Sequence, residues 1–358
     1  MEKPRLYIEY AFWKQLVSDV SIDGMRSFVE LFDLLLRSDV HMDVDAERLM
    51  QLVGEDQYLM KLWKYHMSGQ LSLQLGTEAK QNAILSGTTT DIKDLMAVFL
   101  LDRSEAFCQD VANRLGLMVL GVGTVRKHRS YFDGDGIMVQ RGKRYGAFWM
   151  SFADKLRQVC HSLIVVDPYI GRDRNSVEVN LLTLLDAVLP TSLSLPFHLS
   201  LFVMAENGHS GERLQARLAS RLQGMRPDMA FELTIYQITK LDRFHDRYLL
   251  SNNVFVECGA GFDLFNDQGY AGKDTKVDII YPHTQNHTPS DTEAYWRFLE
   301  VTKRTHLRAF DNGTVRNYWG TKVNRLFDAV EGVEEPPVQR PYRRYADKDR
   351  RGRRQYKK

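Results

Sequence analysis

The chain has 358 residues, 44% of them hydrophobic and 26% charged, with a formal net charge of +2. This composition is typical of a globular protein and excludes a chain that binds polyanions strongly along its whole length, and the length favours two domains over one. No apolar run reaches the length of a membrane-spanning helix and the amino terminus lacks a secretory apolar segment, so we expect a cytoplasmic location.

The three cysteines, Cys108, Cys160 and Cys258, are odd in number and far apart in the sequence. Their spacing fits neither a metal site nor a disulfide framework. This pattern agrees with a reducing compartment.

The first third of the chain is predicted to mix strands and helices. The segment RLYIEYAFW near the amino terminus alternates in polarity and predicts a strand. Helical periodicity follows from Met25 to Leu36 and again from Ala46 to Lys64. Thr88 to Asp91 predicts a turn or a helix cap.

A clearer unit follows. Met96 to Leu101 is an apolar strand, Asp102 to Arg114 is an amphipathic helix, and LGLMVLGVG is a second apolar strand. A strand, helix and strand of this length form a βαβ unit, which predicts a parallel sheet.

The sequence turns polar and glycine-rich from Thr124 to Tyr145, which predicts a domain boundary. After it, a helix from Phe148 to Cys160 and the strand LIVVDPYIG begin a second alternation of helices and strands, which continues to VDIIYP. We therefore predict an α/β protein with an α/β domain over residues 1–123, a linker over 124–145, a second α/β domain over 146–335 and a disordered basic tail over 336–358.

The tail reads QRPYRRYADKDRRGRRQYKK from residue 339 and is nearly free of aliphatic residues. Such a segment either keeps the protein in solution or clamps the phosphates of nucleic acid or of anionic lipid. Its tyrosines can stack on bases, which favours nucleic acid. The candidate nucleic-acid-binding residues are Arg343, Arg344, Arg350, Arg351, Arg353 and Arg354.

The densest group of candidate site residues lies in FHDRYLLSNNVFVECGAGFDLF. His245 and Arg247 are two residues apart, so on an extended strand both side chains share one face. A guanidinium offers a planar fork for phosphate, and an imidazole can donate, accept or attack. Gly259 and Gly261 then allow close backbone approach, so that their amides can cradle an anion.

Asp263 follows this turn and is predicted to orient His245 or Arg247. The candidate catalytic residues are thus His245, Arg247 and Asp263, and the candidate phosphate ligands are His245, Arg247, Gly259 and Gly261. The alternative is a structural ion-pair network of His245 and Arg247 with Asp263 or Asp167.

This stretch resembles the phospholipase D superfamily, and most of all the phospholipase D-like domain at the carboxyl terminus of MIT-domain proteins. The resemblance covers about residues 145–285. It rests on Asp167-Pro168-Tyr169 after a strand, on His245-Asp246-Arg247, and on Gly259, Gly261, Phe262, Asp263 and Phe265. It implies phosphate or phosphoinositide binding without hydrolysis.

The catalytic members of that superfamily use His-x-Lys twice, with an Asp four residues after the Lys. Here Arg247 replaces the Lys, Asn252 stands near the place of the Asp, and a second His-x-Lys is missing from the sequence. A single half-site would need a homodimer with a two-fold axis for catalysis.

Acidic residues at strand ends suggest a second site in the first half. The carboxylates of Glu9, Asp94 and Asp102 are predicted to converge at one edge of a parallel sheet. There they would hold Mg²⁺ or Mn²⁺ for phosphodiester cleavage. The segment FLLDRSEAFCQDVANRLGLMVLG resembles the end of a PIN-like nuclease domain, although Glu9 stands where that family has Asp. The alternative is that these carboxylates cap helices or are exposed.

Three functional hypotheses follow. The first is a cytoplasmic protein that recognises phosphate and binds or processes nucleic acid, in the manner of prokaryotic defence or mobile-element systems. The second is a phosphodiesterase or nuclease, acting through His245 across a dimer or through the acidic metal site. The third is an adaptor that binds anionic lipid.

Overall fold

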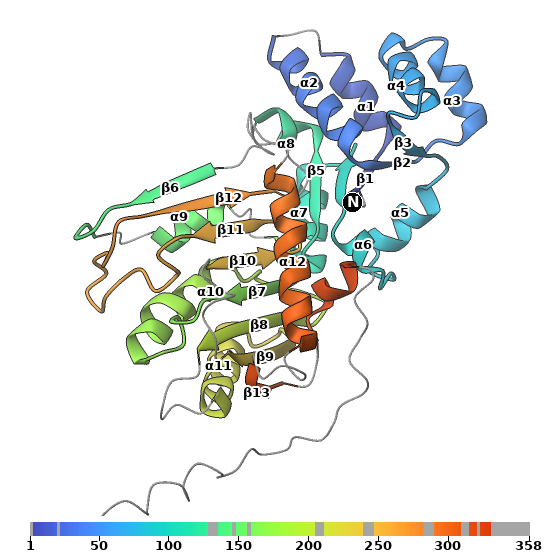
Figure 1. Ribbon diagram of the computed structural model, residues 1–358. Coiled ribbons are helices and arrows are strands. Elements are labelled where there is room, and N and C mark those ends of the chain that lie inside the picture. The colour runs from blue at the N-terminus through green and yellow to red at the C-terminus, as the bar shows by residue number, and fades with distance from the viewer. Residues whose placement is uncertain are drawn as a thin grey trace, which may run out of the picture.

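The computed structural model describes residues 3–19, 22–127, 135–144, 148–155, 159–204, 211–238, 247–281, 290–308, 315–320 and 323–330. Helices and strands are interleaved along the chain around two β-sheets (Figure 1), which confirms the predicted α/β class. None of the helices in these ranges combines the length and the apolar character needed to cross a bilayer.

The first sheet has five parallel strands in the order β3-β2-β1-β4-β5. The strands are β1 (Arg5–Ile8), β2 (Asp39–Met42), β3 (Ser72–Gln74), β4 (Val98–Leu101) and β5 (Met118–Gly121). Successive side chains of β1 point to opposite faces, and helices cover both faces, so Leu6, Tyr7 and Ile8 of β1 and all four residues of β4 are buried.

Eight helices accompany this sheet: α1 (Tyr10–Val17), α2 (Ile22–Arg37), α3 (Ala46–Val53), α4 (Gln57–Met67), α5 (Glu78–Leu85), α6 (Ile92–Leu95), α7 (Glu105–Leu115) and α8 (Val122–Lys127). Residues from α1 to α4 pack with Leu6 and Ile8, whereas residues from α5 to α7 pack with Tyr7 on the other face. Asp91 caps α6 by accepting from the Lys93 amide at 3.0 Å, which confirms a predicted cap.

The predicted amino-terminal strand RLYIEYAFW is only half correct. The strand ends at Ile8, and α1 begins at Tyr10. Phe12, Trp13 and Leu16 recur at helical spacing and are buried. That spacing places the three side chains on one side of a helix. The helical pattern spans only a few residues, so in the sequence alone it does not outweigh the alternating pattern that predicts a strand.

The second sheet has eight strands in the order β13-β9-β8-β7-β10-β11-β12-β6. Strands β7, β8 and β9 are parallel, and the remaining neighbours are antiparallel. The strands are β6 (Asp135–Val139), β7 (Ser162–Val166), β8 (Phe197–Met204), β9 (Phe231–Ile238), β10 (Tyr248–Ser251), β11 (Phe255–Cys258), β12 (Thr275–Ile280) and β13 (Val315–Trp319).

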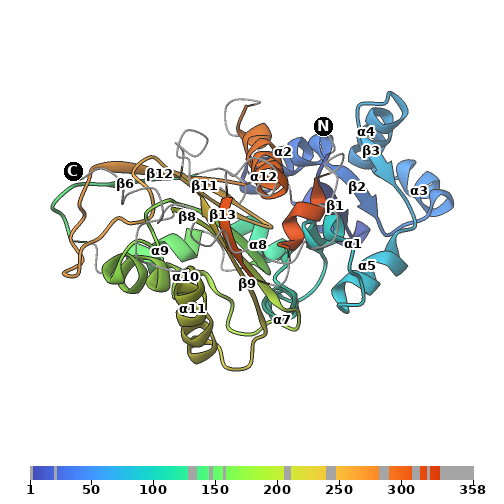
Figure 2. The same ribbon diagram turned by 60° about the horizontal axis from the view of Figure 1, so that its bottom comes forward.

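Helices lie on both sides of the second sheet (Figure 2). One side carries α9 (Phe148–Lys155), the π-helix η1 (Ser176–Leu181), α10 (Leu182–Val188) and α11 (Gly211–Met225). The other side carries α12 (Ser290–Arg308) and the 3₁₀-helix η3 (Arg325–Ala329). Tyr295 of α12 anchors that side, because its hydroxyl donates to the Ser251 carbonyl at 2.8 Å.

The segment 124–145, predicted as a linker, contains part of α8 and all of β6. Strand β6 pairs with β12 over five residues, and its Val139 is fully buried. The linker prediction is therefore wrong for this strand. Its partner lies far away in the sequence, so local composition carries no sign of the pairing.

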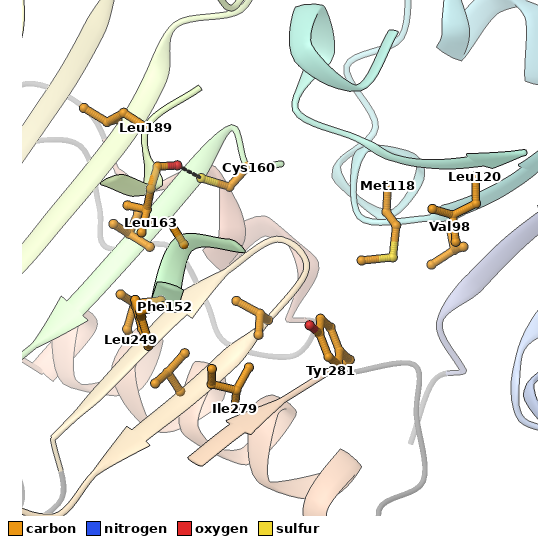
Figure 3. Packing of buried hydrophobic residues seen from close by; sticks show 14 of the residues in the cluster. Val98, Met118, Leu120, Phe152, Cys160, Leu163, Leu189, Leu249, Ile279 and Tyr281 are labelled. Atoms are coloured by element: carbon orange, nitrogen blue, oxygen red, sulfur yellow. Dashed lines mark hydrogen bonds between the residues drawn. The ribbon is translucent and has the colours of Figure 1, made fainter. Parts of the chain in front are cut away.

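Buried side chains join the two sheets into continuous apolar clusters. Figure 3 shows Met118 and Leu120 of the first sheet, Leu163 and Ile279 of the second sheet, and Tyr281 directly after β12, all members of one cluster. Cys160 also lies there, with its thiol directed at the Val188 carbonyl oxygen at 3.8 Å.

Hydrogen bonds also cross from one half of the chain to the other. Asn252, which is fully buried, donates from Nδ2 to the Gly116 carbonyl and accepts from the His161 amide, both at 2.9 Å. His161 Nε2 lies 3.0 Å from the Leu95 carbonyl oxygen, and Nδ1 lies 2.9 Å from Ser162 Oγ. Since a carbonyl only accepts, Nε2 of His161 carries a hydrogen, and burial favours the neutral form of the ring.

Because His161 is buried in its neutral form, we expect the free energy of unfolding to fall in mild acid. Burial lowers the pKa of His161 from 6.5 to about 3, so below pH 6.5 the unfolded chain binds a proton that the folded chain does not. We expect His161 to cost the protein about 2 kcal/mol of unfolding free energy between pH 7 and pH 5. Urea unfolding of wild type and His161→Gln at both pH values measures this, and the variant should lose about 2 kcal/mol less. Equal losses in the two proteins would contradict it.

Candidate functional site

The candidate site lies at the edge of the second sheet where β7 ends. Asp167 directly follows β7, and Arg247 directly precedes β10. Because β10 runs antiparallel to β7, with Tyr248 paired to Val166, these two residues meet at the same edge. Strand β11 ends at the same edge, because the amide of its last residue, Cys258, donates to the Arg247 carbonyl at 2.9 Å. Gly259 directly follows this strand.

The side chain of Arg247 is half-buried and held at two points. Nη1 donates to the Gly259 carbonyl at 3.0 Å, and Cζ lies 5.6 Å from the centroid of the Tyr169 ring. A guanidinium over an aromatic face is favourable, and the ring restricts its orientation. The structure thus fixes the cation that the sequence singled out. His245 and Asp246 lie outside the described residues.

The glycine turn after β11 serves a purpose different from the predicted one. The Ala260 amide donates to Thr275 Oγ1 at 3.1 Å, and the Gly261 amide donates to the Cys258 carbonyl at 3.0 Å. The next amide, of Phe262, donates to Asp167 Oδ2 at 2.6 Å. The prediction that the Gly261 amide binds an external anion is therefore wrong, because this amide and its two neighbours donate to groups of the protein itself, whereas the same prediction for Gly259 stays a prediction.

Gly261 is nevertheless required by the geometry of this turn. Its φ is +86°, a left-handed conformation that side chains rarely adopt. A Cβ at this position would lie 2.8 Å from Asp167 Oδ2 and 3.4 Å from Arg247 Cγ. Glycine is present because the turn closes directly on Asp167.

Asp167 is fully buried, and its Oδ1 accepts from the Tyr169 amide at 2.8 Å. Burial raises the pKa of Asp167, while its two amide hydrogen bonds and the nearby Arg247 oppose that shift. The sequence analysis named Asp167 in the Asp-Pro-Tyr pattern and as a possible partner of Arg247 in the alternative structural ion-pair network, but not among the candidate site residues.

Asp263 is held by other groups. Its Oδ1 accepts from Asn180 Nδ2 at 3.0 Å, and its Oδ2 lies 3.7 Å from Arg172 Nη2. Burial raises the pKa of Asp263, and Ser176 and Arg172 oppose the shift. The carboxylate beside Arg247 is thus Asp167, which takes the place that the sequence gave to Asp263.

Sequence reasoning missed Arg172 and Asn180. Asn180 is fully buried in η1, the π-helix Ser176–Leu181, where it also accepts from the Leu264 and Phe265 amides. A π-helical turn is uncommon and occurs often near functional sites. The sequence carried little signal for Asn180, because Glu178 and Thr183 are also polar in the segment that follows Ser176.

The acidic residues of the first half do not converge as predicted. Glu9 and Asp102 follow β1 and β4 and meet at one edge, where Glu9 Oε2 accepts from the Asp102 amide at 2.6 Å. Asp94 precedes β4 and therefore lies at the opposite edge. There it accepts from Tyr7 Oη at 2.7 Å and pairs with Arg5 Nη1 at 2.6 Å and Lys80 Nζ at 3.2 Å.

The predicted metal site at Glu9, Asp94 and Asp102 is therefore wrong. Glu9 is neutralised locally, because Arg103 Nη2 lies 2.9 Å from its Oε1. Asp43, which the sequence analysis passed over, follows β2 at the Glu9 edge and contributes to the raised pKa of Glu9, of which burial is the main cause. Within the described ranges, the structure holds no group of three or more His, Cys, Asp or Glu side chains placed to bind a metal ion.

The arginines of the predicted nucleic-acid clamp, residues 343–354, lie outside the described residues. No protein-family model matches the chain, and no curated protein sequence matches it. The phospholipase D-like and PIN-like resemblances therefore stay predictions.

Proposed function

We propose that this protein recognises phosphate groups of nucleic acid at the edge of the second sheet, through Arg247. The observation that carries the proposal is the fixed position of the Arg247 guanidinium, held between the Gly259 carbonyl and the Tyr169 ring. A guanidinium held in place loses less freedom when it binds a phosphate, so its charge-assisted hydrogen bonds are stronger in effect.

The surroundings of Arg247 support a nucleic acid as the ligand. Asp167 is sealed from solvent, so its charge is offset by amides and by Arg247 instead of facing the ligand. Tyr169 is only partly buried and places an aromatic ring beside the cation. Proteins that bind single-stranded nucleic acid combine cationic and aromatic side chains in this way. The basic segment 336–358 adds affinity without sequence choice.

Arg247→Ala is expected to weaken binding to a single-stranded oligonucleotide about tenfold at moderate salt. The reason is the loss of the fixed Arg247 guanidinium, while the basic segment keeps its general attraction. Fluorescence anisotropy with a labelled oligonucleotide measures the effect. Arg304→Ala is the matched control, because Arg304 is exposed on α12, where it pairs with Glu300 one turn away. Equal affinity of wild type and Arg247→Ala would refute the proposal.

Deleting residues 336–358 is a separate arm of the same experiment. It should lower affinity for all sequences and reduce the slope of log affinity against log salt, because fewer counterions are released. Sedimentation with vesicles of phosphatidylcholine with and without anionic lipid tests the lipid alternative. Stronger, Arg247-dependent binding to anionic vesicles than to oligonucleotide would replace nucleic acid by lipid as the ligand.

A further inference from the structure

We infer that Asp167 is the positioning residue of the Arg247 site, because its buried carboxylate fixes both supports on which the Arg247 guanidinium rests. The inference deepens the proposed function and rests on it for its binding assay. It assigns to Asp167 a task that neither the motif in the sequence nor the phosphate chemistry of Arg247 specifies.

The first support is Tyr169. Its backbone amide donates to Asp167 Oδ1 at 2.8 Å, which closes a tight turn directly after β7. The ring of the same residue lies under the Arg247 guanidinium, 5.6 Å from Cζ. Asp167 therefore determines where this ring stands relative to the sheet.

The second support is the glycine turn. The Phe262 amide donates to the other carboxylate oxygen, Asp167 Oδ2, at 2.6 Å. This bond draws the turn onto the end of β7, and the turn presents the Gly259 carbonyl to Arg247 Nη1 at 3.0 Å. One carboxylate thus ties the ends of β7 and β11 together at the site, next to Arg247 at the start of β10.

The charge of Asp167 makes its role testable by the sign of an effect. Removing a carboxylate next to a phosphate site should strengthen anion binding if charge alone matters. Removing a positioning residue should weaken binding, because the guanidinium then loses its fixed orientation. The two roles of Asp167 therefore predict opposite changes in affinity.

The experiment compares Asp167→Asn, Gly261→Ala and Asp173→Asn in the full chain with a labelled single-stranded oligonucleotide. Asp167→Asn removes the charge and one of the two amide acceptors. Gly261→Ala keeps the charge but pushes its Cβ to within 2.8 Å of Asp167 Oδ2. Asp173→Asn removes a half-exposed carboxylate beside Arg172 and leaves the turn untouched, and its amide oxygen can still accept from Ser176.

We expect Asp167→Asn and Gly261→Ala each to weaken binding about fivefold, and Asp173→Asn to leave it unchanged or slightly stronger. In an Arg247→Ala background, Asp167→Asn should cause no further loss, because Asp167 acts through Arg247. Thermal unfolding verifies that each variant is folded. Affinity equal to or above wild type in both Asp167→Asn and Gly261→Ala would overturn the inference while the proposed function stands.

A second readout does not depend on the ligand. In an NMR spectrum, the Arg247 Nε–H resonance is assigned by its absence in Arg247→Lys. In Asp167→Asn and Gly261→Ala, its chemical shift should move toward the values of exposed arginines. If wild type fails to bind the oligonucleotide, the proposed function falls and this signal alone decides the role of Asp167. An unchanged signal in both folded variants would then overturn the positioning role.

Discussion

Gly116→Ala is expected to destabilise the protein by about 2–4 kcal/mol, because two costs add at this position. Gly116 ends α7 with φ +67°, a left-handed conformation in which alanine is strained. Its Cβ would also lie 2.7 Å from Cys160 C and His161 N, which are backbone atoms directly before β7 of the second sheet. Backbone cannot turn aside as a flexible side chain does, so the contact between the two sheets would have to open. Urea unfolding measures the loss.

Gly69→Ala is the matched control for this substitution. Gly69 has φ +74°, and a Cβ there would meet nothing within 4 Å. It should cost about 1 kcal/mol, the conformational part alone. The difference between the two variants isolates the contact of Gly116 with Cys160 and His161. A difference near zero would show that the two halves do not pack as closely as described.

Asn180→Leu is expected to lower the unfolding free energy by about 3–4 kcal/mol. The fully buried Asn180 accepts from the Leu264 and Phe265 amides at 3.1 and 2.9 Å and donates to Asp263 Oδ1 and the Phe265 carbonyl at 3.0 and 2.8 Å. Leucine has a similar volume but leaves two buried amides without this acceptor, which is costly in an apolar surrounding. Urea unfolding again gives the measurement.

Asn175→Ala serves for comparison, since Asn175 donates to the same Phe265 carbonyl at 3.2 Å through one hydrogen bond. It should cost no more than about 1 kcal/mol, because that carbonyl keeps its bond from Asn180. Similar losses in the two variants would show that Asn180 is not the residue that holds the segment Leu264–Phe265 against η1.

The chemistry open to the protein depends on where its carboxylates lie. Metal-dependent cleavage needs carboxylates gathered at one place, and Asp94 stands at the far edge of the sheet from Glu9 and Asp102. At the second sheet, the carboxylate next to the cation is buried and bound by amides. Both arrangements agree with the proposed recognition of phosphate through Arg247.

Local patterns predicted the elements whose signal is itself local. Apolar runs such as Met96 to Leu101 gave buried strands, and Asp91 gave a cap, because strand burial and capping depend on neighbours in the chain. Strand β6 was missed, since its pairing with β12 joins residues more than a hundred positions apart. The predicted amino-terminal strand was too long, because what holds the chain at Glu9, where the strand stops, is not local. The Glu9 carboxylate accepts from the Asp102 amide and pairs with Arg103, both far away in the sequence.

The sequence by itself determined the α/β class and was enough to select Arg247 as a candidate phosphate ligand, because hydrophobic periodicity and the chemistry of a guanidinium are properties of the residues. Only the tertiary structure decided which carboxylate serves that cation and what the glycine turn holds. Asp167 and Phe262 are joined by a hydrogen bond of 2.6 Å across 95 positions of sequence. Such a contact arises from the pairing of β7 with β10 and of β10 with β11, so it exists only once the sheet has formed.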